Sequence, residues 1–398
     1  MPIIALWSYL NIYLLVRCTL KIQQSYWTQS EGWDTTPNAT SDFNPQLVFI
    51  FASTAILSNH QHFEKIQSYY PDAYLVGCST AGEICDTRVR DESISLTAVS
   101  FEKTKIKQAV HRVQNKADSY PVGKALAQQL LTDDLVHVFI LSDGLTVNGT
   151  ELVRGFSETL PDHVVVTGGL SGDGDRFQQT LICANDKPSE DSIVAIGFYG
   201  QHLKVGFGSL GGWDPFGPQR KVTKSSGNIL YELDNHSALE LYKQYLGKHA
   251  EGLPATGLLF PLALRTPNST DQGIVRTILS IDEKSQSMTF AGDIPENSTV
   301  QLMKANFDRL IDGATDAAHL TQVNLNTSPQ LAILISCVGR KLVLKQRIEE
   351  EVEGVRDVLG DNTILTGFYS YGEISPHTPT ARCELHNQTM TITTFTED

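Results

Sequence analysis

The 398 residues of this chain are enough for two or three domains, each with its own hydrophobic core. A composition of 41% hydrophobic and 19% charged residues is typical of a globular protein. The net charge of −14, without any run rich in Lys and Arg, argues against electrostatic binding to nucleic acid or to an anionic membrane.

The six cysteines lie at positions 18, 78, 85, 183, 337 and 383, and no two of them form a C-x-x-C pair. This spacing fits neither a zinc site nor a dense disulfide framework, so we expect reduced thiols and a cytoplasmic protein. The chain also lacks a G-x-x-x-x-G-K-[S/T] phosphate loop and an H-E-x-x-H metal motif.

Residues 3–16 are apolar and uncharged. The segment is shorter than the roughly 20 residues of a membrane-spanning helix, and it lacks the basic start of a signal peptide. Three interpretations are open, namely an extension outside the folded protein, a membrane-associating segment and an ordered core element. We treat residues 1–20 as an N-terminal extension, and we expect membrane contact only if residues 1–17 are an anchor.

A strand–turn–helix–strand pattern occurs three times, after a predicted strand at residues 19–27 and a loop at residues 28–45. The three repeats are predicted at residues 47–84, 135–174 and 331–374, and their helices at residues 58–70, 148–160 and 341–359. Each repeat has the size of a βαβ unit, roughly 30 to 40 residues. We therefore expect an α/β fold of two domains whose mixed sheets are built from repeated strand–helix–strand units.

Other segments alternate as antiparallel strands do. Residues 192–208 predict a hairpin that turns at Gly200 and Gln201, and residues 274–291 predict a second hairpin. An amphipathic helix is predicted at residues 238–246.

The turns that end the repeats resemble one another. Residues 77–84 (GCSTAGEI) and 367–374 (GFYSYGEI) both fit G-x-x-[S/T]-x-G-E-I, and residues 168–174 (GGLSGDG) form a looser copy. Turns of this kind after parallel strands present backbone N–H groups and small hydroxyls to a ligand. The candidate ligand-binding residues are Ser79, Thr80, Gly82, Glu83, Asp143, Ser171, Asp173, Tyr369, Ser370, Tyr371, Gly372 and Glu373.

Glu83 and Glu373 directly follow the turn glycine, and two roles are open for them. Each carboxylate could receive the ammonium of an amino acid whose carboxylate binds the N–H groups and hydroxyls of the turn. Alternatively, each Glu braces its own turn. Asp173 lies in a segment that lacks the terminal Glu of a calcium loop, so we expect it to shape its turn.

Nine segments of the chain together resemble the FIST family (F-box and intracellular signal transduction proteins). The segments are VGCSTAGEI (76–84), GGLSGDGDRF (168–177), GGWDPFGP (211–218), GNILYELD (227–234), ALELYKQYLG (238–247), FAGDIP (290–295), MKANFDRLIDGA (303–314), SCVGRKLVLKQR (336–347) and TGFYSYGEISP (366–376). The resemblance implies a FIST N-terminal domain at residues 44–236, a FIST C-terminal domain at residues 237–380, and a terminal strand and tail at residues 381–398.

The resemblance also implies a function. Family members look like sensory modules, so we expect a cytoplasmic signal-transduction sensor that binds a small ligand, such as an amino acid, and regulates a partner protein. One alternative is a haem-based nitric-oxide sensor that regulates a histidine kinase, although no C-x-x-C-H motif is present and none of the eleven His stands out as an axial ligand.

A second alternative is an uncharacterised enzyme that uses Cys78 or Glu83. Cys78 lies outside a G-x-S-x-G nucleophile elbow, and a buried, unreactive thiol is the usual state of such a cysteine. We therefore expect a binding protein rather than an enzyme, without catalytic residues or a metal site.

Overall fold

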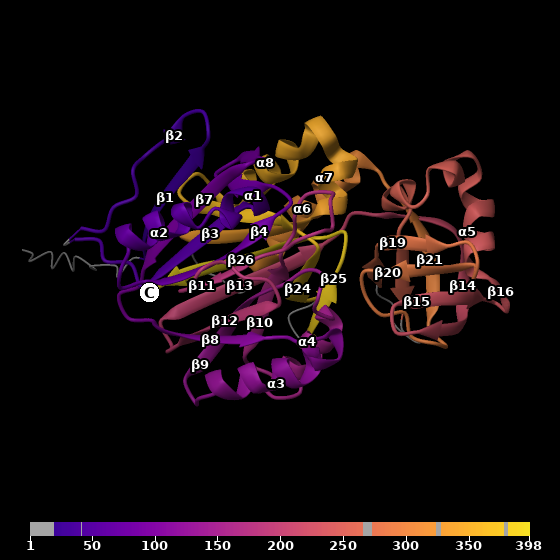
Figure 1. Cartoon of the computed structure of the whole chain (residues 1–398), viewed down its shortest axis with the longest axis horizontal. Coiled ribbons are helices and arrows are strands. Elements are labelled where there is room, and N and C mark those ends of the chain that lie inside the picture. The colour runs from indigo at the N-terminus through magenta and orange to yellow at the C-terminus, as the bar shows by residue number, and fades with distance from the viewer. Residues whose placement is uncertain (1–19, 41, 266–272, 324–327, 378–380) are drawn as a thin grey trace, which may run out of the picture.

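A computed structural model describes residues 20–40, 42–265, 273–323, 328–377 and 381–398, so the apolar residues 3–16 lie outside it. It confirms an α/β protein with mixed sheets, arranged as two bodies (Figure 1). The core body contains residues 20–213 and 305–398, and the small domain, residues 214–304, is inserted between them. Within the described part of the chain, no helix is long and apolar enough to span a membrane.

The core body is built from three repeats. The first contains β1 (Lys21–Thr28), β2 (Gly32–Trp33), β3 (Leu47–Ser53), α1 (Thr54–Ser58), α2 (His60–Tyr69), β4 (Tyr74–Thr80), β5 (Glu83–Cys85), β6 (Arg88–Arg90) and β7 (Ser93–Ser100). The second contains β8 (Lys105–Arg112), the 3-10 helix η1 (Lys116–Asp118), α3 (Ser119–Leu130), β9 (Leu135–Ser142), α4 (Gly149–Ser157), β10 (Val165–Leu170), β11 (Ile182–Ala184) and β12 (Ser192–Tyr199). The third contains β13 (Leu203–Leu210), α6 (Phe307–Thr321), β22 (Leu331–Cys337), α7 (Val338–Leu344), η4 (Lys345–Arg347), α8 (Ile348–Leu359), β23 (Ile364–Ser370), β24 (Gly372–Pro376), β25 (Cys383–His386) and β26 (Met390–Glu397).

Each repeat supplies the centre of one six-stranded sheet. The strand orders are β11-β4-β3-β7-β1-β2 in the first sheet, β25-β24-β10-β9-β12-β8 in the second and β13-β26-β22-β23-β5-β6 in the third. In each sheet the two strands joined by a helix are parallel, namely β3 with β4, β9 with β10 and β22 with β23. The predicted repeats are thus present, as one βαβ unit per sheet.

The continuous apolar runs of these strands reflect burial on both faces of each sheet. In β3, Phe49 and Phe51 face a central core shared by the three sheets, whereas Val48 and Ile50 face α1 and α2. Three aromatic pairs each join two different sheets across this core, with ring centroids 4.8–5.5 Å apart: Phe49–Phe139, Phe51–Phe368 and Phe198–Phe395.

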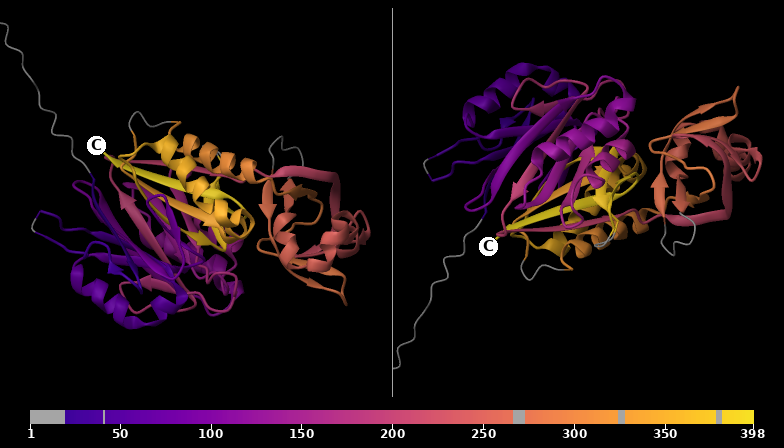
Figure 2. Two further views of the ribbon diagram at one scale, coloured as in Figure 1. Left: turned by 90° about the horizontal axis from the view of Figure 1, so that it is seen from above. Right: turned by 90° about the horizontal axis from the view of Figure 1, so that it is seen from below.

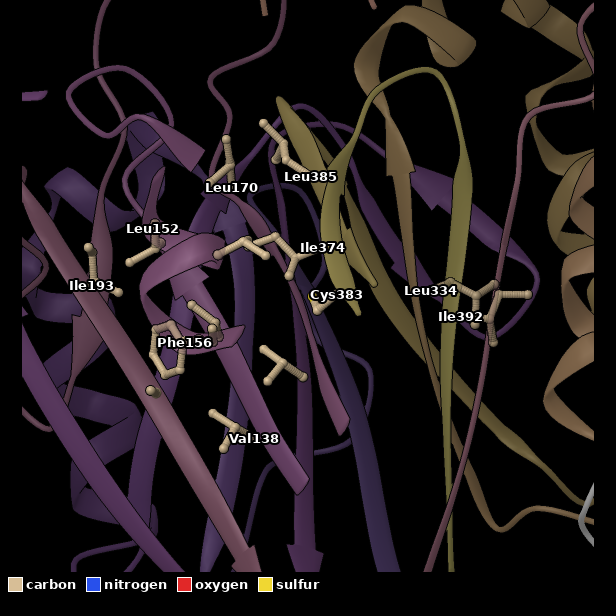
Figure 3. Packing of buried hydrophobic residues seen from close by; sticks show 14 of the residues in the cluster. Val138, Leu152, Phe156, Leu170, Ile193, Leu334, Ile374, Cys383, Leu385 and Ile392 are labelled. Atoms are coloured by element: carbon tan, nitrogen blue, oxygen red, sulfur yellow. The ribbon is translucent and has the colours of Figure 1, made fainter. Parts of the chain in front are cut away.

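Helices cover the outer faces of the sheets. Leu152 and Phe156 of α4 pack against the second sheet, and Leu170, Ile374 and Leu385 lie together where β10, β24 and β25 adjoin (Figure 3). Views from above and below show the small domain attached at one end of the core body (Figure 2).

The strand after each Gly-rich turn joins a neighbouring sheet instead of its own. β5 of the first repeat pairs with β23 in the third sheet, β11 of the second pairs with β4 in the first, and β24 of the third pairs with β10 in the second. The exchange is therefore cyclic, and every sheet is completed by a strand from another repeat.

Two details of the sequence prediction are wrong. The hairpin at residues 192–208 does not form, because β12 already lies between β9 and β8 in the second sheet while β13 pairs with β26 in the third. The single helix at residues 341–359 is divided into α7, η4 and α8, because Lys345 adopts a left-handed conformation (φ +52°) that an α-helix cannot continue through.

The small domain contains an eight-stranded sheet around its own core. Its elements are β14 (Asp214–Ser226), β15 (Ile229–Leu233), β16 (His236–Ser237), α5 (Ala238–Leu246), η2 (Gly247–Gly252), η3 (Ala255–Leu259), β17 (Leu262–Arg265), β18 (Ile274–Arg276), β19 (Ile278–Asp282), β20 (Ser287–Phe290) and β21 (Thr299–Lys304). The predicted helix is α5, and the predicted second hairpin is β19 with β20. The expected boundary at residues 236 and 237 falls within β16, so the halves of the sequence do not coincide with the two bodies.

Replacing Gly367 with Ala should destabilise the core body by more than about 3 kcal/mol, since overpacking against rigid backbone cannot relax locally. A Cβ atom there would lie 1.8 Å from the carbonyl oxygen of Leu334, and the equivalent Gly77 and Gly168 have the same contact at 1.9 Å. Urea unfolding monitored by circular dichroism measures the change.

Gly360 is the control, because its backbone (φ +86°, ψ +163°) also favours glycine but no atom lies within 4 Å of a Cβ position. Gly360→Ala should cost about 1–3 kcal/mol, from backbone strain alone. Equal losses in the two variants would contradict the close approach of the strands.

Candidate functional site

The three Gly-rich turns meet in the middle of the core body. The amide of Ala81 donates to the carbonyl of Tyr369 at 2.8 Å, that of Gly172 to Ser79 at 2.9 Å, and that of Tyr371 to Leu170 at 3.3 Å. The amide of Tyr369 also donates to the carbonyl of Gly82 at 2.8 Å, so each turn is hydrogen-bonded to both of the others. We call this closed arrangement the turn ring, and it brings together the three segments that the sequence singled out.

The two glutamates of the turns occupy equivalent places. Glu83 is 1% exposed and accepts from the Thr80 hydroxyl and from the amide and hydroxyl of Ser93, at 3.1 and 2.7 Å for the latter two. Glu373 is fully buried and accepts from the Ser370 hydroxyl at 2.6 Å and from the amide and hydroxyl of Thr389 at 3.2 and 2.9 Å. This geometry is that of two carboxyls bracing their turns.

Burial raises the pKa of Glu83 to about 7 and that of Glu373 to about 8, against the opposing effect of these hydrogen bonds. Arg340 acts on Glu373 from a distance and lowers its pKa slightly, but burial outweighs this effect. Near neutral pH each is therefore partly protonated.

The other predicted side chains are also engaged within the core body. Ser79 accepts from the amide of Leu181, and Ser171 donates to the carbonyl of Ser142. Tyr369 donates to Glu351 at 2.6 Å, and Glu351 forms a fully buried ion pair with Arg340. Asp143 accepts from the amides of residues 145 and 146, each at 2.8 Å.

Asp173 organises the loop that follows the second turn. Its carboxylate is 1% exposed and accepts from the amides of Phe177, Gln178 and Gln179 at 2.8–2.9 Å. The Tyr371 hydroxyl donates to the same carboxylate, and the rings of Tyr371 and Phe177 stack with centroids 4.3 Å apart. Burial, followed by the hydrogen bond to Asp173, raises the pKa of Tyr371.

A cavity of about 1180 Å³ lies where the core body and the small domain face each other. From the core body its wall includes Lys116, Gly144, Leu145, Val147, Asn148, Gly149, Leu170, Asp175, Phe177, Phe307, Cys337, Val338, Leu342, Val343, Lys345 and Tyr371. From the small domain it includes Asn228, residues 252–256, 258 and 259, 277–279 and 290–293. Of the twelve predicted site residues, Tyr371 alone is part of this wall.

The wall of the cavity is mainly apolar, with charges of both signs on exposed or half-buried residues. Lys116 and Lys345 carry the positive charges, and Asp175 and Asp293 carry the negative ones. Three large apolar side chains of the wall are exposed, namely Phe177 at 42%, Leu279 at 43% and Phe307 at 45%. Exposed apolar surface around a cavity is typical of a site that binds another molecule.

The sequence offered little indication of this wall. Leu279 and Asp293 of the small domain and Phe307 of the core body lie in segments without a ligand-binding motif. They line one cavity only because the two bodies pack together. Phe177 directly follows the conspicuous GDGDR segment, which is the one signal that pointed close to the wall.

The wall does not fit haem. It contains no His or Met among its described residues, and burial raises the pKa of the Cys337 thiol, which disfavours the thiolate that binds iron. The Tyr371 hydroxyl is bonded to Asp173. No group of three or more His, Cys, Asp or Glu side chains suited to a metal ion occurs in the described parts of the chain.

Comparison with known proteins gives a family. Residues 46–236 match the FIST N domain, and residues 238–376 match the FIST C domain. An uncharacterized protein of Methanocaldococcus jannaschii, MJ1623, is 24% identical over 356 residues, which cover 79% of this chain. The chain spans 66% of the length of that relative.

Two solved structures are weakly similar. A cyanuric acid hydrolase aligns with 96% of this chain and 100% of its own, at 7% identity and a TM-score of 0.29. The cyanuric acid hydrolase of A. caulinodans aligns with 74% of this chain and 99% of its own, at 9% identity and a TM-score of 0.18. These scores are too low to support an inference about fold or activity.

The buried carboxyls predict a loss of stability above pH 6.5. Between pH 4.5 and their raised pKa values, Glu83 and Glu373 bind protons in the folded state that the unfolded state has released, so stability falls as the pH rises. His137 and His386, whose pKa values burial lowers to about 3, act in the opposite direction, but only up to about pH 6.5. From pH 6.5 to 8 the free energy of unfolding should fall by about 2 kcal/mol.

Urea unfolding at several pH values measures this slope. The double variant Glu83→Gln and Glu373→Gln keeps a neutral hydrogen-bonding group at both positions and should lose most of the slope while remaining folded. An unchanged slope in the double variant would assign the pH dependence to other groups.

Proposed function

The chain belongs to the FIST family, whose domains are associated with signal-transduction sensing, and we propose that it is a sensor whose ligand binds in the cavity between the core body and the small domain. The observation that carries the proposal is the position of this cavity. Its two walls belong to different bodies, so a ligand that contacts both favours one arrangement of the bodies over others.

Apolar and polar contacts join the two bodies, and the apolar ones include Trp213 and Leu310 of the core body with Val275 of the small domain. Arg276 of the small domain, 4% exposed, donates to the carbonyl of Leu385 in β25 at 2.9 Å and to that of Asp293 at 3.2 Å. Burial lowers the pKa of Arg276 to about 10. The chain enters the small domain just after Gly212. A Cβ atom at Gly212 would lie 1.8 Å from the Arg309 carbonyl, so the two connecting segments pack tightly against each other.

The ligand is a small molecule, such as an amino acid or a similar compound. The apolar wall suits a hydrophobic side chain, while Asp175 or Asp293 suits an ammonium group and Lys116 or Lys345 a carboxylate. A volume of about 1180 Å³ also accommodates molecules larger than a single amino acid.

A binding role fits the buried groups better than catalysis does. The Cys78 thiol is fully buried and burial raises its pKa, which suppresses the nucleophilic thiolate. Glu83 is bonded to its own turn and lies outside the cavity wall. In the proposal the output passes to a partner protein, such as a histidine kinase, in the cytoplasm, where the five free, buried cysteines of the described chain would stay reduced.

A thermal-shift screen of the full chain against the twenty amino acids and a panel of small metabolites tests the proposal. A ligand present at one hundred times its dissociation constant adds about 2.7 kcal/mol to the free energy of unfolding and raises the melting temperature. Leu342→Trp, which places an indole in the cavity, should abolish the shift.

The control is Leu131→Trp, which changes a 40% exposed leucine outside the cavity wall and should leave the shift intact. A ligand whose shift survives Leu342→Trp binds elsewhere and removes the cavity from the proposal. A panel without any shift would leave the sensor role unsupported.

A further inference from the structure

We propose that the ligand of the cavity carries a planar aromatic ring, which stacks on the exposed face of Phe177. The inference rests on the proposed function, because it concerns the same cavity and narrows the chemical class of its ligand. It names Phe177 as the residue that selects a flat ring over an aliphatic group of equal size.

The ring of Phe177 is stacked on one side, and the residue is still partly exposed in the cavity wall. It stacks on Tyr371 with centroids 4.3 Å apart and an interplanar angle of 15°. Yet 42% of the residue remains exposed, and it forms part of the cavity wall. Aromatic rings stack favourably on such a surface in an offset arrangement, which an aliphatic group cannot match.

The backbone at Phe177 is strained, and hydrogen bonds hold it in place. Phe177 has a φ of +53°, which is unfavourable for a bulky residue. Its amide donates to Asp173 at 2.8 Å and lies 3.2 Å from the Tyr371 hydroxyl, and the next two amides also donate to Asp173. Strained residues that the surroundings hold in place concentrate at ligand sites.

A role as a hydrophobic plug explains this arrangement less well. A plug would be buried, whereas Phe177 is among the most exposed large apolar residues of the described chain. Gly144 leaves room for the stacked rings of Tyr371 and Phe177. A Cβ atom at Gly144 would lie 3.0 Å from a ring carbon of Tyr371 and 2.0 Å from the Ser171 carbonyl, so a side chain there would displace the stacked pair.

Matched probes separate flatness from hydrophobicity. L-phenylalanine and L-cyclohexylalanine have the same charges and nearly the same size, but only the first has a planar ring, and indole is a planar ring without the amino-acid groups. Isothermal titration of the full chain should show that the planar probes bind about tenfold tighter than cyclohexylalanine, the factor that corresponds to about 1.4 kcal/mol. Binding of phenylalanine but not indole would identify an aromatic amino acid, and the reverse a free heterocycle; both support the planar ring.

Two variants test the residue itself. Phe177→Trp keeps a planar ring and should retain the binding of the planar probes. Phe177→Gly removes the ring and tolerates the positive φ, so it should abolish the preference for planar probes. The melting temperature should fall by only a few degrees, because relief of the backbone strain offsets part of the lost stacking on Tyr371. A variant that no longer folds would show that the ring is a structural plug and would overturn the inference.

The remaining outcomes distinguish this inference from the function on which it rests. If phenylalanine and cyclohexylalanine bind equally well, or if Phe177→Gly binds planar probes as the wild type does, the planar ring is refuted while the cavity remains a ligand site. If no probe binds and the metabolite screen gives no shift, both proposals fail together.

Discussion

The backbone hydrogen bonds between the three Gly-rich turns are the constraint on which the core body depends. They require the carboxyl ends of β4, β10 and β23 to converge, and each following strand must then leave for a neighbouring sheet. The close approach of Gly77, Gly168 and Gly367 to adjacent carbonyls keeps the strands at the spacing that this convergence needs. The position of every sheet therefore follows from the geometry at one point.

Tyr371 connects this central arrangement with the cavity. Its amide donates to Leu170 within the turn ring, its hydroxyl bonds Asp173, and its ring forms part of the cavity wall beside Phe177. A ligand that displaces Tyr371 therefore acts directly on contacts between the second and third repeats. In the proposed sensor, Tyr371 couples ligand binding in the cavity, at the edge of the core body, directly to the turn ring at its centre.

The sequence predicted the repeated βαβ units, because strands buried on both faces are continuously apolar and their turns need glycine for close packing. It also placed the three turns correctly relative to their strands. It did not predict that β13 would leave the expected hairpin, since pairing between sheets depends on the cyclic exchange and not on local turn residues. The cavity wall was not predicted for a similar reason, because Leu279 and Phe307 line the same cavity as Phe177 only through the packing of the two bodies. The sequence singled out Glu83 and Glu373 but left their role open. Their burial, which favours a role in bracing the turns, is a property of the tertiary structure alone.

The cyclic exchange of strands has a consequence for synthesis on the ribosome. The second sheet lacks the two strands at one of its edges until β24 and β25 emerge, after the small domain and most of the third repeat have been made. The first 236 residues include a domain by sequence, but they contain an incomplete second sheet and only β13, β5 and β6 of the third sheet. Assembly of the core body therefore has to wait for the third repeat, and until then the exposed strand edges of the nascent chain are natural substrates for chaperones.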